Sequence, residues 1–292
     1  MFCFPKRIKQ YAGRYSLVDG IPFKLPVNTS NSPALMVIFP INEEKAKQFL
    51  PHGIHPFRLW KKALLVVTVI NYKDTTIGKY IEYSIAIACT HGEKPAPRLL
   101  PGIFMNFFKT GQYVIDLPVS SEVSVKGGKG IWGMPKHQGH LDFKIEGNKV
   151  SSQYDLDGKL VTYVEIEAPK NTCIPVKTIA SNYCSFRGML MKSDILLNTK
   201  FGLNVFSKAK ARFVIGDHPR LQAMKQLEIG KPLATMFLPS INGTLDDHIE
   251  SWFLDYEKLP EVAPEGLESI INLGLSEEWL SPPTAPIPDE QD

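Results

Sequence analysis

The sequence contains little cysteine, no excess of charge of one sign and no long apolar run. Its four cysteines are scattered through 292 residues without a C-x-x-C pair, so we expect reduced thiols rather than a disulfide framework or a paired zinc site. The 33 basic and 30 acidic residues are interleaved and give a net charge of only +3, so the one-sign field that nucleic-acid binding uses is missing. No apolar run approaches the ~18–20 residues that cross a bilayer.

The first ten residues, MFCFPKRIKQ, lack the apolar stretch and the small-residue cleavage site of a secretory signal. We therefore expect a soluble, cytoplasmic protein with no membrane or nucleic-acid partner. Two H-x-x-H pairs occur, His52 with His55 and His137 with His140. On a strand, positions i and i+3 face opposite sides, so neither pair predicts a metal site.

Most of the chain reads as short β-branched runs separated by Gly, Asp and Asn turns at intervals of roughly ten residues. Alternating βα units are absent, so a doubly wound sheet is disfavoured. This pattern predicts a mainly β (α+β) fold, an antiparallel meander that closes into a barrel or sandwich. The predicted strands are 63–72, 80–90, 103–108, 113–117, 140–146, 150–156, 160–168, 201–215 and 248–256.

A few short helices and two irregular ends complete the predicted organisation. Asn42 is placed to cap a helix that stops before Pro51, and 219–228 and 264–273 are further helical candidates. Residues 1–30 are expected to form an extended arm, residues 31–280 a single domain, and the proline-rich residues 281–292 a disordered tail.

The segment from Gly128 to Lys136 has the most distinctive composition in the chain. Its Gly-Lys-Gly-Ile-Trp-Gly stretch satisfies G-x-G-x-x-G, but no helix is expected to open there, so the pattern predicts a glycine-rich β-loop and not a dinucleotide site. Lys136 follows a proline-fixed turn and is preceded by Ile131, Trp132 and Met134, which could hold it in an apolar wall. Most loop lysines are instead solvated, because burying an ammonium group is costly.

These residues resemble the acetoacetate decarboxylase family, in which a glycine-rich segment precedes Pro-Lys-Lys. Gly128–His137 overlies that pattern, Tyr80–Tyr83 overlies a strand that carries the family's active-site glutamate, and Pro33–Pro51 overlies its opening strand and helix. The resemblance spans roughly residues 20–257. It implies that Lys136 is the Schiff-base nucleophile and Glu82 the active-site glutamate. It also implies a closed, cone-like antiparallel β-barrel with a few peripheral helices, assembled as a homo-oligomer.

Three family positions carry other residues in this chain. Where the family has the second lysine of the pair, this chain has His137. The family's arginine aligns with about Ser32, and its second glutamate aligns near Thr68. His137 is a candidate for proton transfer, because its unperturbed pKa is near neutrality, or for a packing role. Trp132, Met134 and Lys129 are the candidates for substrate binding. A substrate carboxylate needs a cationic or amide partner, and the candidate cations are Arg14, Arg58, Arg98 and Lys129.

The resemblance implies an enzyme that needs no cofactor and acts on a small keto acid. The leading interpretation is a decarboxylase that forms a lysine iminium with a β-keto acid. A first alternative keeps the iminium but uses its enamine for carbon–carbon bond formation or dehydration, as an aldolase-dehydratase or cyclase. A second alternative is a small-molecule binding barrel without catalytic activity.

Overall fold

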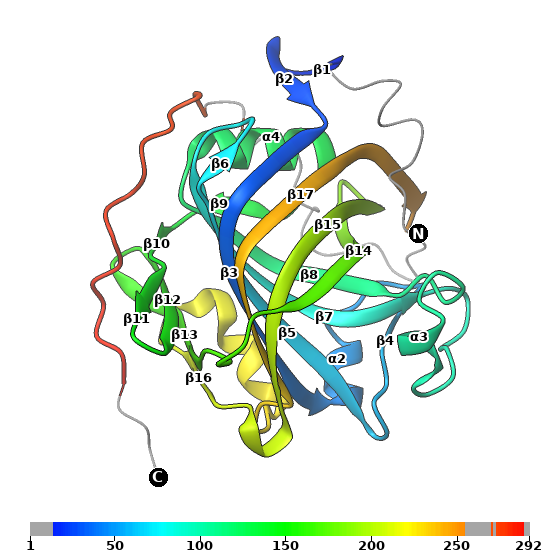
Figure 1. Ribbon diagram of the computed structural model, residues 1–292. Coiled ribbons are helices and arrows are strands. Elements are labelled where there is room, and N and C mark those ends of the chain that lie inside the picture. Colours follow the sequence, from blue (N-terminus) through cyan, green and yellow to red (C-terminus); the bar gives the residue numbers. More distant parts are fainter. Residues whose placement is uncertain (1–13, 255–269, 271–272, 289–292) are drawn as a thin grey trace.

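The structure is a computed structural model that describes residues 14–254, 270 and 273–288. Within these residues, seven strands form a closed ring (Figure 1). In ring order they are β7 (Tyr80–His91), β5 (Lys62–Tyr72), β3 (Val27–Asn42), β17 (Ala234–Phe253), β15 (Met189–Val205), β14 (Ile174–Phe186) and β8 (Gly111–Val119), and β8 pairs again with β7. All neighbours are antiparallel except β8 and β14, which run parallel. The mainly β barrel expected from the sequence is confirmed.

A second sheet covers one side of the barrel (Figure 1). It consists of β10 (His140–Leu141), β11 (Lys144–Glu146), β12 (Lys149–Leu156), β13 (Lys159–Glu167) and β16 (Ala211–Ile215). Short strands extend the barrel sheet or precede it: β1 (Arg14–Val18), β2 (Ile21–Leu25), β4 (Ile54–Pro56), β6 (Asp74–Thr75) and β9 (Lys136–Gln138). The helices are α2 (Glu43–Lys47), α3 (Leu100–Ile103), α4 (Glu122–Trp132), and the 3-10 helices η1 (Phe206–Lys208) and η2 (Pro219–Leu227).

The largest hydrophobic core lies between the barrel wall and the second sheet, not inside the barrel. Successive side chains of a strand point to opposite faces, so the odd-numbered residues of β7 from Ile81 to Ile87 pack outward against β12 and β13. The odd-numbered residues of β5 from Leu65 to Val69 do the same. The even-numbered residues of both strands point into the barrel, whose interior is therefore available for a site.

Most expected elements are present, and three local predictions are wrong; one is the strand expected over 201–215, which η1 divides into the end of β15 and the separate strand β16. The Asn42 side chain caps α2 by accepting from the backbone amides of Glu44 and Lys45, as expected. Residues 103–108 do not form a strand but continue α3 into turns. Residues 128–132 belong to α4 rather than to a β-loop, because tertiary packing overrides the low helix propensity of glycine. The G-x-G-x-x-G stretch thus ends a helix instead of opening one, which leaves no site for a pyrophosphate.

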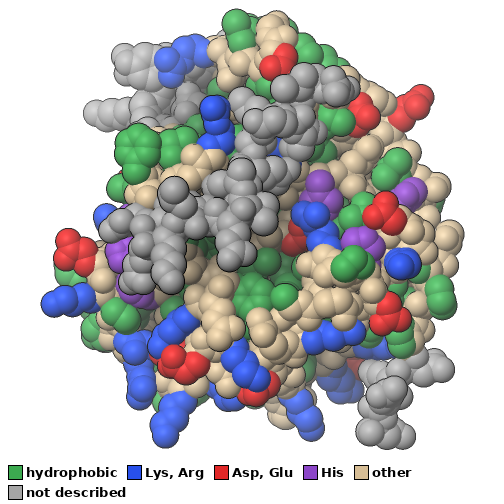
Figure 2. All heavy atoms as spheres, turned by 180° about the vertical axis from the view of Figure 1, so that it is seen from behind, with side chains coloured by type: hydrophobic (Ala, Val, Ile, Leu, Met, Phe, Trp, Pro, Cys, Tyr) green, Lys and Arg blue, Asp and Glu red, His purple; other side chains and the backbone are tan. Residues whose placement is uncertain are grey.

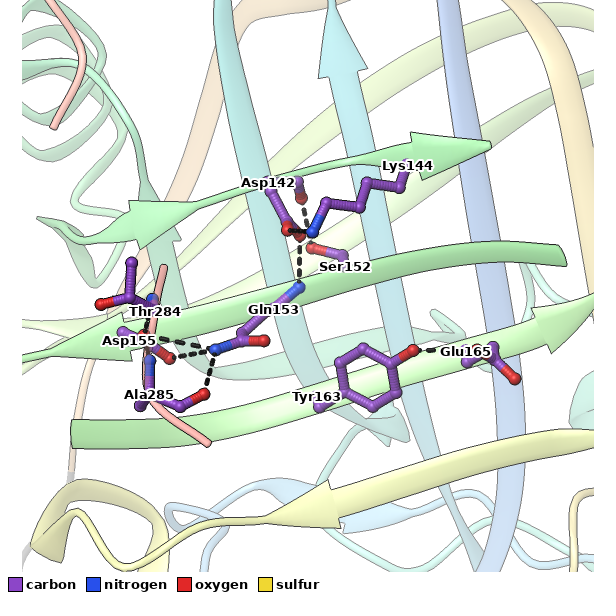
Figure 3. Close-up of polar contacts among 9 residues, drawn as sticks. All are labelled: Asp142, Lys144, Ser152, Gln153, Asp155, Tyr163, Glu165, Thr284 and Ala285. Atoms are coloured by element: carbon purple, nitrogen blue, oxygen red, sulfur yellow. Dashed lines mark hydrogen bonds and ion pairs between the residues drawn. The ribbon is translucent and has the colours of Figure 1, made fainter. Parts of the chain in front are cut away.

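The C-terminal segment contacts α4 and Lys79 over residues 273–279 and then runs along the outside of the second sheet over residues 281–288 (Figure 1). Figure 3 shows that the buried carboxylate of Asp155 accepts hydrogen bonds from the backbone amides of Thr284 and Ala285, at 2.6 and 2.7 Å. Gln153 donates to the Ala285 carbonyl oxygen at 2.8 Å. Residues 281–288 fall within the part expected to be a disordered tail, and this buried acceptor gives them defined contacts.

Residues 14–30, in the expected arm, form the β1–β2 hairpin and the start of β3. Val18 and Phe23 of this hairpin are buried in a cluster with Val123 and Val125 of α4, so the hairpin packs on the helix that precedes Lys136. On the face seen in Figure 2, acidic and basic side chains are interspersed. Among the described helices, none has the length and apolar character needed to cross a membrane. The helix expected over 264–273 falls almost entirely outside the described residues.

Candidate active site

A cavity of about 90 Å3 lies within the barrel. One water needs only about 10–15 Å3, so the cavity has room for a small organic molecule. Its walls are inward-facing positions two residues apart on each strand, as the period of a β-strand requires, except at the bulge in β8, where Val114 and Leu117 are three apart. They are Val27 and Thr29 on β3; Thr68, Ile70 and Tyr72 on β5; Tyr80, Glu82 and Ser84 on β7; Gln112, Val114 and Leu117 on β8; Asn182 and Cys184 on β14; Ser193 and Ile195 on β15; Gly243 and Leu245 on β17; and Thr75, Met134 and Lys136.

The turn between α4 and β9 places Lys136 on this wall. Gly133 ends α4 with a left-handed φ of 64°, a conformation that glycine adopts without strain. Its amide donates to the Lys129 carbonyl oxygen, and the Met134 amide donates to the Gly128 carbonyl oxygen. Pro135 prevents the helix from continuing. The chain therefore turns into β9, where Lys136 pairs with Leu117 of β8 and points into the barrel.

The Lys136 amine has three neighbours that the structure defines closely. Its Nζ lies 2.8 Å from Glu82 Oε2, and the two side chains are 4% and 12% exposed. The same nitrogen donates to Ser124 Oγ on α4 at 3.0 Å and lies 5.1 Å from the centre of the Tyr80 ring. A buried ammonium without such partners would be strongly unfavourable. Because the Glu82 carboxylate is in direct contact with the amine, it can also accept a proton from it.

Two tyrosines and a cysteine complete the environment of Glu82 and Lys136. The Tyr72 hydroxyl lies 3.5 Å from Glu82 Oε1. Burial, and then the negative charge of Glu82, raise the pKa of Tyr72 and of Tyr80 well above the ordinary value, so both remain hydrogen-bond donors. Burial raises the pKa of Cys184 to about 12, which keeps its thiol protonated and a poor nucleophile. Among the described cavity residues, Lys136 is thus the amine positioned for attack on a carbonyl.

His137 lies on the opposite face of β9 and does not contact the Lys136 amine. A bulge in β8 turns Asp116 outward to the same side. Arg220 of η2 donates to Asp116 Oδ1 at 2.8 Å and, through Nη2, to His137 Nδ1 at 3.0 Å. His137 Nε2 then donates to the Tyr154 hydroxyl at 2.8 Å. Burial, and then the charge of Arg220, lower the pKa of His137 to about 3, so this histidine is neutral and supplies no positive charge.

The expected substrate-binding residues occupy different places. Met134 lines the cavity. Trp132 is buried beneath the wall, where its indole nitrogen donates to the Asp246 carbonyl oxygen at 2.9 Å, and Lys129 is buried on α4 without lining the cavity. None of the four cations considered as carboxylate partners, Arg14, Arg58, Arg98 and Lys129, is among the described lining residues.

Two positions at which the chain departs from the family pattern can now be placed. Thr68 lines the cavity on β5, and its buried hydroxyl oxygen has no hydrogen-bond partner within the described part of the chain. Ser32 is buried outside the lining and exchanges a hydrogen bond of 2.8 Å with Thr29. The described residues also hold no group of three His, Cys, Asp or Glu side chains arranged to bind a metal ion.

Sequence reasoning missed Ser124, Gln112 and Asn182. Ser124 and Gly128 are four residues apart and so share one face of α4, but this signal was lost because the segment was not expected to be helical. Gln112 and Asn182 come from strands 70 residues apart that pair in parallel. No local pattern in the sequence predicts that pairing.

Comparisons with known proteins agree with this architecture. The acetoacetate decarboxylase (ADC) family matches residues 12–173, more than half of the chain. Acetoacetate decarboxylase from Legionella pneumophila has a TM-score of 0.57 at 13% identity, covering 77% of this chain and 89% of its own. The enduracididine biosynthesis enzyme MppR, in complex with pyruvate, has a TM-score of 0.58 at 14% identity, covering 81% and 93%.

An acetoacetate decarboxylase-like enzyme from Sphingomonas wittichii RW1 has a TM-score of 0.52 at 12% identity, covering 80% of this chain and 95% of its own. A search of curated proteins finds no significant match. The barrel has the fold of the acetoacetate decarboxylase-like proteins. The chain belongs to the acetoacetate decarboxylase family.

The close approach of Gly128 to Lys136 yields a test of the site's geometry. A Cβ atom at Gly128 would lie 2.4 Å from Lys136 Cδ and 2.7 Å from Cε, so Gly128→Ala must displace the lysine side chain. Alanine favours the helix by about 1 kcal/mol, so we expect the folded state to persist while the reactivity of the amine falls at least tenfold. Thermal unfolding and the rate of keto-acid trapping by borohydride measure the two effects.

The matched control is Gly127→Ala in the same helix, whose added Cβ would meet the Phe23 ring rather than Lys136. Its amine should keep the reactivity of the unchanged protein. Equal trapping rates for Gly128→Ala and Gly127→Ala would contradict the placement of Lys136.

The buried, neutral His137 predicts a specific pH dependence of stability. Its pKa is about 3 in the folded protein and about 6.5 in an unfolded chain, so the unfolded state binds the extra proton as the pH falls below about 6.5. His137 therefore contributes stability above that pH and loses it toward pH 3. As the pH falls through this range, the free energy of unfolding of His137→Gln should rise relative to that of the unchanged protein by up to about 1.4 kcal/mol per pH unit. Urea unfolding from pH 7 to pH 4 measures the difference, and parallel curves would refute the assignment.

Proposed function

We propose that this protein is a Schiff-base decarboxylase of a small β-keto acid. The observation that carries the proposal is the Lys136 amine, buried on the wall of a cavity and 2.8 Å from the Glu82 carboxylate. Membership of the acetoacetate decarboxylase family supports it. A lysine side chain in ordinary solution is protonated at neutral pH and cannot attack a carbonyl, so a neighbouring proton acceptor is essential.

Formation of the iminium needs three proton transfers, and Glu82 is placed for two of them. The carboxylate first takes a proton from the Lys136 ammonium group, which frees the nitrogen lone pair to attack the keto carbon. The attacking nitrogen passes a second proton to the former keto oxygen, which gives a carbinolamine, and the protonated Glu82 then donates its proton to that hydroxyl group, which leaves as water. Ser124 accepts a hydrogen bond from Nζ and holds it in position. The product is an iminium between Lys136 and the substrate.

The iminium then accepts the electron pair of the bond that breaks. The bond between the α-carbon and the carboxylate carbon is cleaved, CO2 leaves, and its bonding electrons form an enamine with the lysine nitrogen. A proton from solvent, which Glu82 as a carboxylate can take up and pass on, adds to the α-carbon. Water then hydrolyses the new iminium, releasing a ketone and the free amine. The scheme uses no cofactor, because the lysine nitrogen itself serves as the electron sink.

The neutral lining of the cavity favours decarboxylation over reactions that retain the carboxylate. Among the described lining residues, the only cation is Lys136 itself. A carboxylate that is lost as neutral CO2 gains from surroundings that do not stabilise its charge, because catalysis depends on binding the transition state better than the substrate. A carboxylate that persists through the reaction requires a counter-ion. This reasoning ranks the decarboxylase first.

A carbon–carbon bond-forming reaction is the second candidate, supported by one structural relative. MppR has been solved with the condensation product of pyruvate and imidazole 4-carboxaldehyde, at a TM-score of 0.56 and 15% identity. The same enamine on Lys136 could attack an aldehyde instead of taking a proton. CO2 release measured against condensation with an added aldehyde separates the two reactions.

Trapping of the iminium tests the nucleophile. The protein treated with acetoacetate and borohydride should gain one reduced adduct that maps to Lys136, and Lys136→Ala should lose both the adduct and turnover. Lys200→Ala, at an exposed position on β15, is the matched control and should keep both. An adduct elsewhere, or full turnover in Lys136→Ala, would refute Lys136 as the nucleophile, and the absence of both adduct and turnover in the unchanged protein would leave the binding barrel.

Removal of the Glu82 charge tests the proton-transfer role. Glu82→Gln keeps the shape of the side chain but cannot accept a proton, so we expect kcat to fall by about 10²–10⁴. Glu146→Gln, at an exposed position on β11, should leave kcat unchanged. An unaltered kcat in Glu82→Gln would reduce Glu82 to a structural partner of the amine.

A further inference from the structure

The cavity wall beyond Lys136 and Glu82 is largely apolar, and the polar residues in it carry no charge. Three of its polar residues, Gln112, Asn182 and Ser193, lie side by side on β8, β14 and β15. Asn182 is the register partner of both Gln112 and Ser193. All three line the cavity, and Asn182 and Ser193 are only 9% and 4% exposed. We refer to these three residues as the amide subsite.

The two amides of this subsite present both a donor and an acceptor. Gln112 Nε2 donates to Asn182 Oδ1 at 2.7 Å, which leaves the Asn182 amino group and the Gln112 carbonyl oxygen for other partners. If the oxygen and nitrogen of both side-chain amides exchange places, one amino group and one carbonyl oxygen again remain for other partners. The Ser193 hydroxyl can donate or accept. An uncharged oxygen that both accepts and donates, such as a hydroxyl group, matches this set of atoms.

Two further hydroxyl groups, those of Thr68 and Ser84, line the cavity between this subsite and the reacting amine. Thr68 and Ser84 are register partners on β5 and β7, and Ser84 follows Glu82 by two residues, or roughly 7 Å along the strand. The Thr68 hydroxyl oxygen is buried without a partner among the described residues. An unsatisfied buried hydroxyl is costly, and a polar ligand in the cavity would satisfy it.

A second carboxylate on the substrate would have no counter-ion here. The described lining residues contain one anion, Glu82, and one cation, Lys136, which the reaction itself consumes. In addition, the free carbonyl oxygen of the amide pair would repel an anion. Transfer of an unpaired carboxylate into such surroundings is strongly unfavourable.

We propose that the substrate is a β-keto monocarboxylic acid whose far end carries an uncharged hydroxyl group, bound by Gln112, Asn182 and Ser193. This inference rests on the proposed function, because it assigns the part of the substrate that does not react at Lys136. The same wall excludes dicarboxylic keto acids. The amide subsite therefore determines specificity, and the amine determines the chemistry.

Three acids with the same six-carbon skeleton test the proposal: 3-oxohexanoate, 6-hydroxy-3-oxohexanoate and 3-oxohexanedioate. They differ only at the last carbon, which is a methyl, a hydroxymethyl or a carboxylate group. CO2 release is measured for each, with subtraction of the rate without protein. We expect kcat/KM to be about tenfold higher for the hydroxy acid than for the methyl acid. The kcat/KM for the dicarboxylic acid should be at least about a hundredfold lower than that for the hydroxy acid.

Asn182→Ala tests the subsite directly. It should reduce the preference for the hydroxy acid over the methyl acid to about twofold or less, because the Asn182 amino group is lost and Gln112 loses the partner that orients its side chain. Asn198→Ala, at an exposed position on the neighbouring β15, is the matched control and should keep the full preference. Thermal unfolding of both variants shows whether the fold is intact, and the preference is a ratio that partial loss of folded protein does not change.

Borohydride trapping of Lys136 with each acid separates this inference from the proposed function. Adducts on Lys136 without a preference for the hydroxy acid, or with equal use of the dicarboxylic acid, would overturn the inference and leave the Schiff-base enzyme in place. A preference that survives in Asn182→Ala would also overturn it. The absence of an adduct with all three acids would overturn both.

Discussion

The contact between the Lys136 amine and the Glu82 carboxylate is the interaction on which the rest of the site depends. Each group would be costly to bury alone, and together they form a compensated pair inside the barrel. The pair also stores the proton that imine chemistry must move twice. Ser124 fixes the amine from the side of α4, and Gly128 leaves room for its methylene chain. A single contact thus combines the stability of a buried charge with the chemistry of a nucleophile and its base.

The fold makes this arrangement possible by separating stability from function. The outward faces of β5 and β7 form the main core with the second sheet, while their inward faces line the cavity. The same separation holds at β9, where Lys136 faces the cavity and His137 faces the network of Asp116, Arg220 and Tyr154. The strand that carries the nucleophile is therefore anchored from outside, without a second cation among the described residues that line the cavity.

Local patterns in the sequence predicted most of the strands, the Asn42 cap and the mainly β class, because period-two alternation and turn residues act over a few positions, but they missed β14 and the first part of β15. Lys136 and Glu82 were found through resemblance to a family, and the structure brings them together. The helical state of residues 122–132 was missed because three glycines lower its intrinsic propensity, while contacts with Phe23 and Val18 stabilise it. The amide subsite was also missed, since it joins strands that pair over 70 residues of sequence. Such long-range pairing has no local signature.

A crystal structure of the protein after borohydride reduction with a β-keto acid tests the central claim most directly. The account predicts continuous density from Lys136 Nζ to a substrate carbon inside the barrel, with Glu82 within hydrogen-bonding distance of the new bond. A Lys136 side chain that is unmodified and turned out of the cavity, or a substrate carbon joined to another residue, would contradict it.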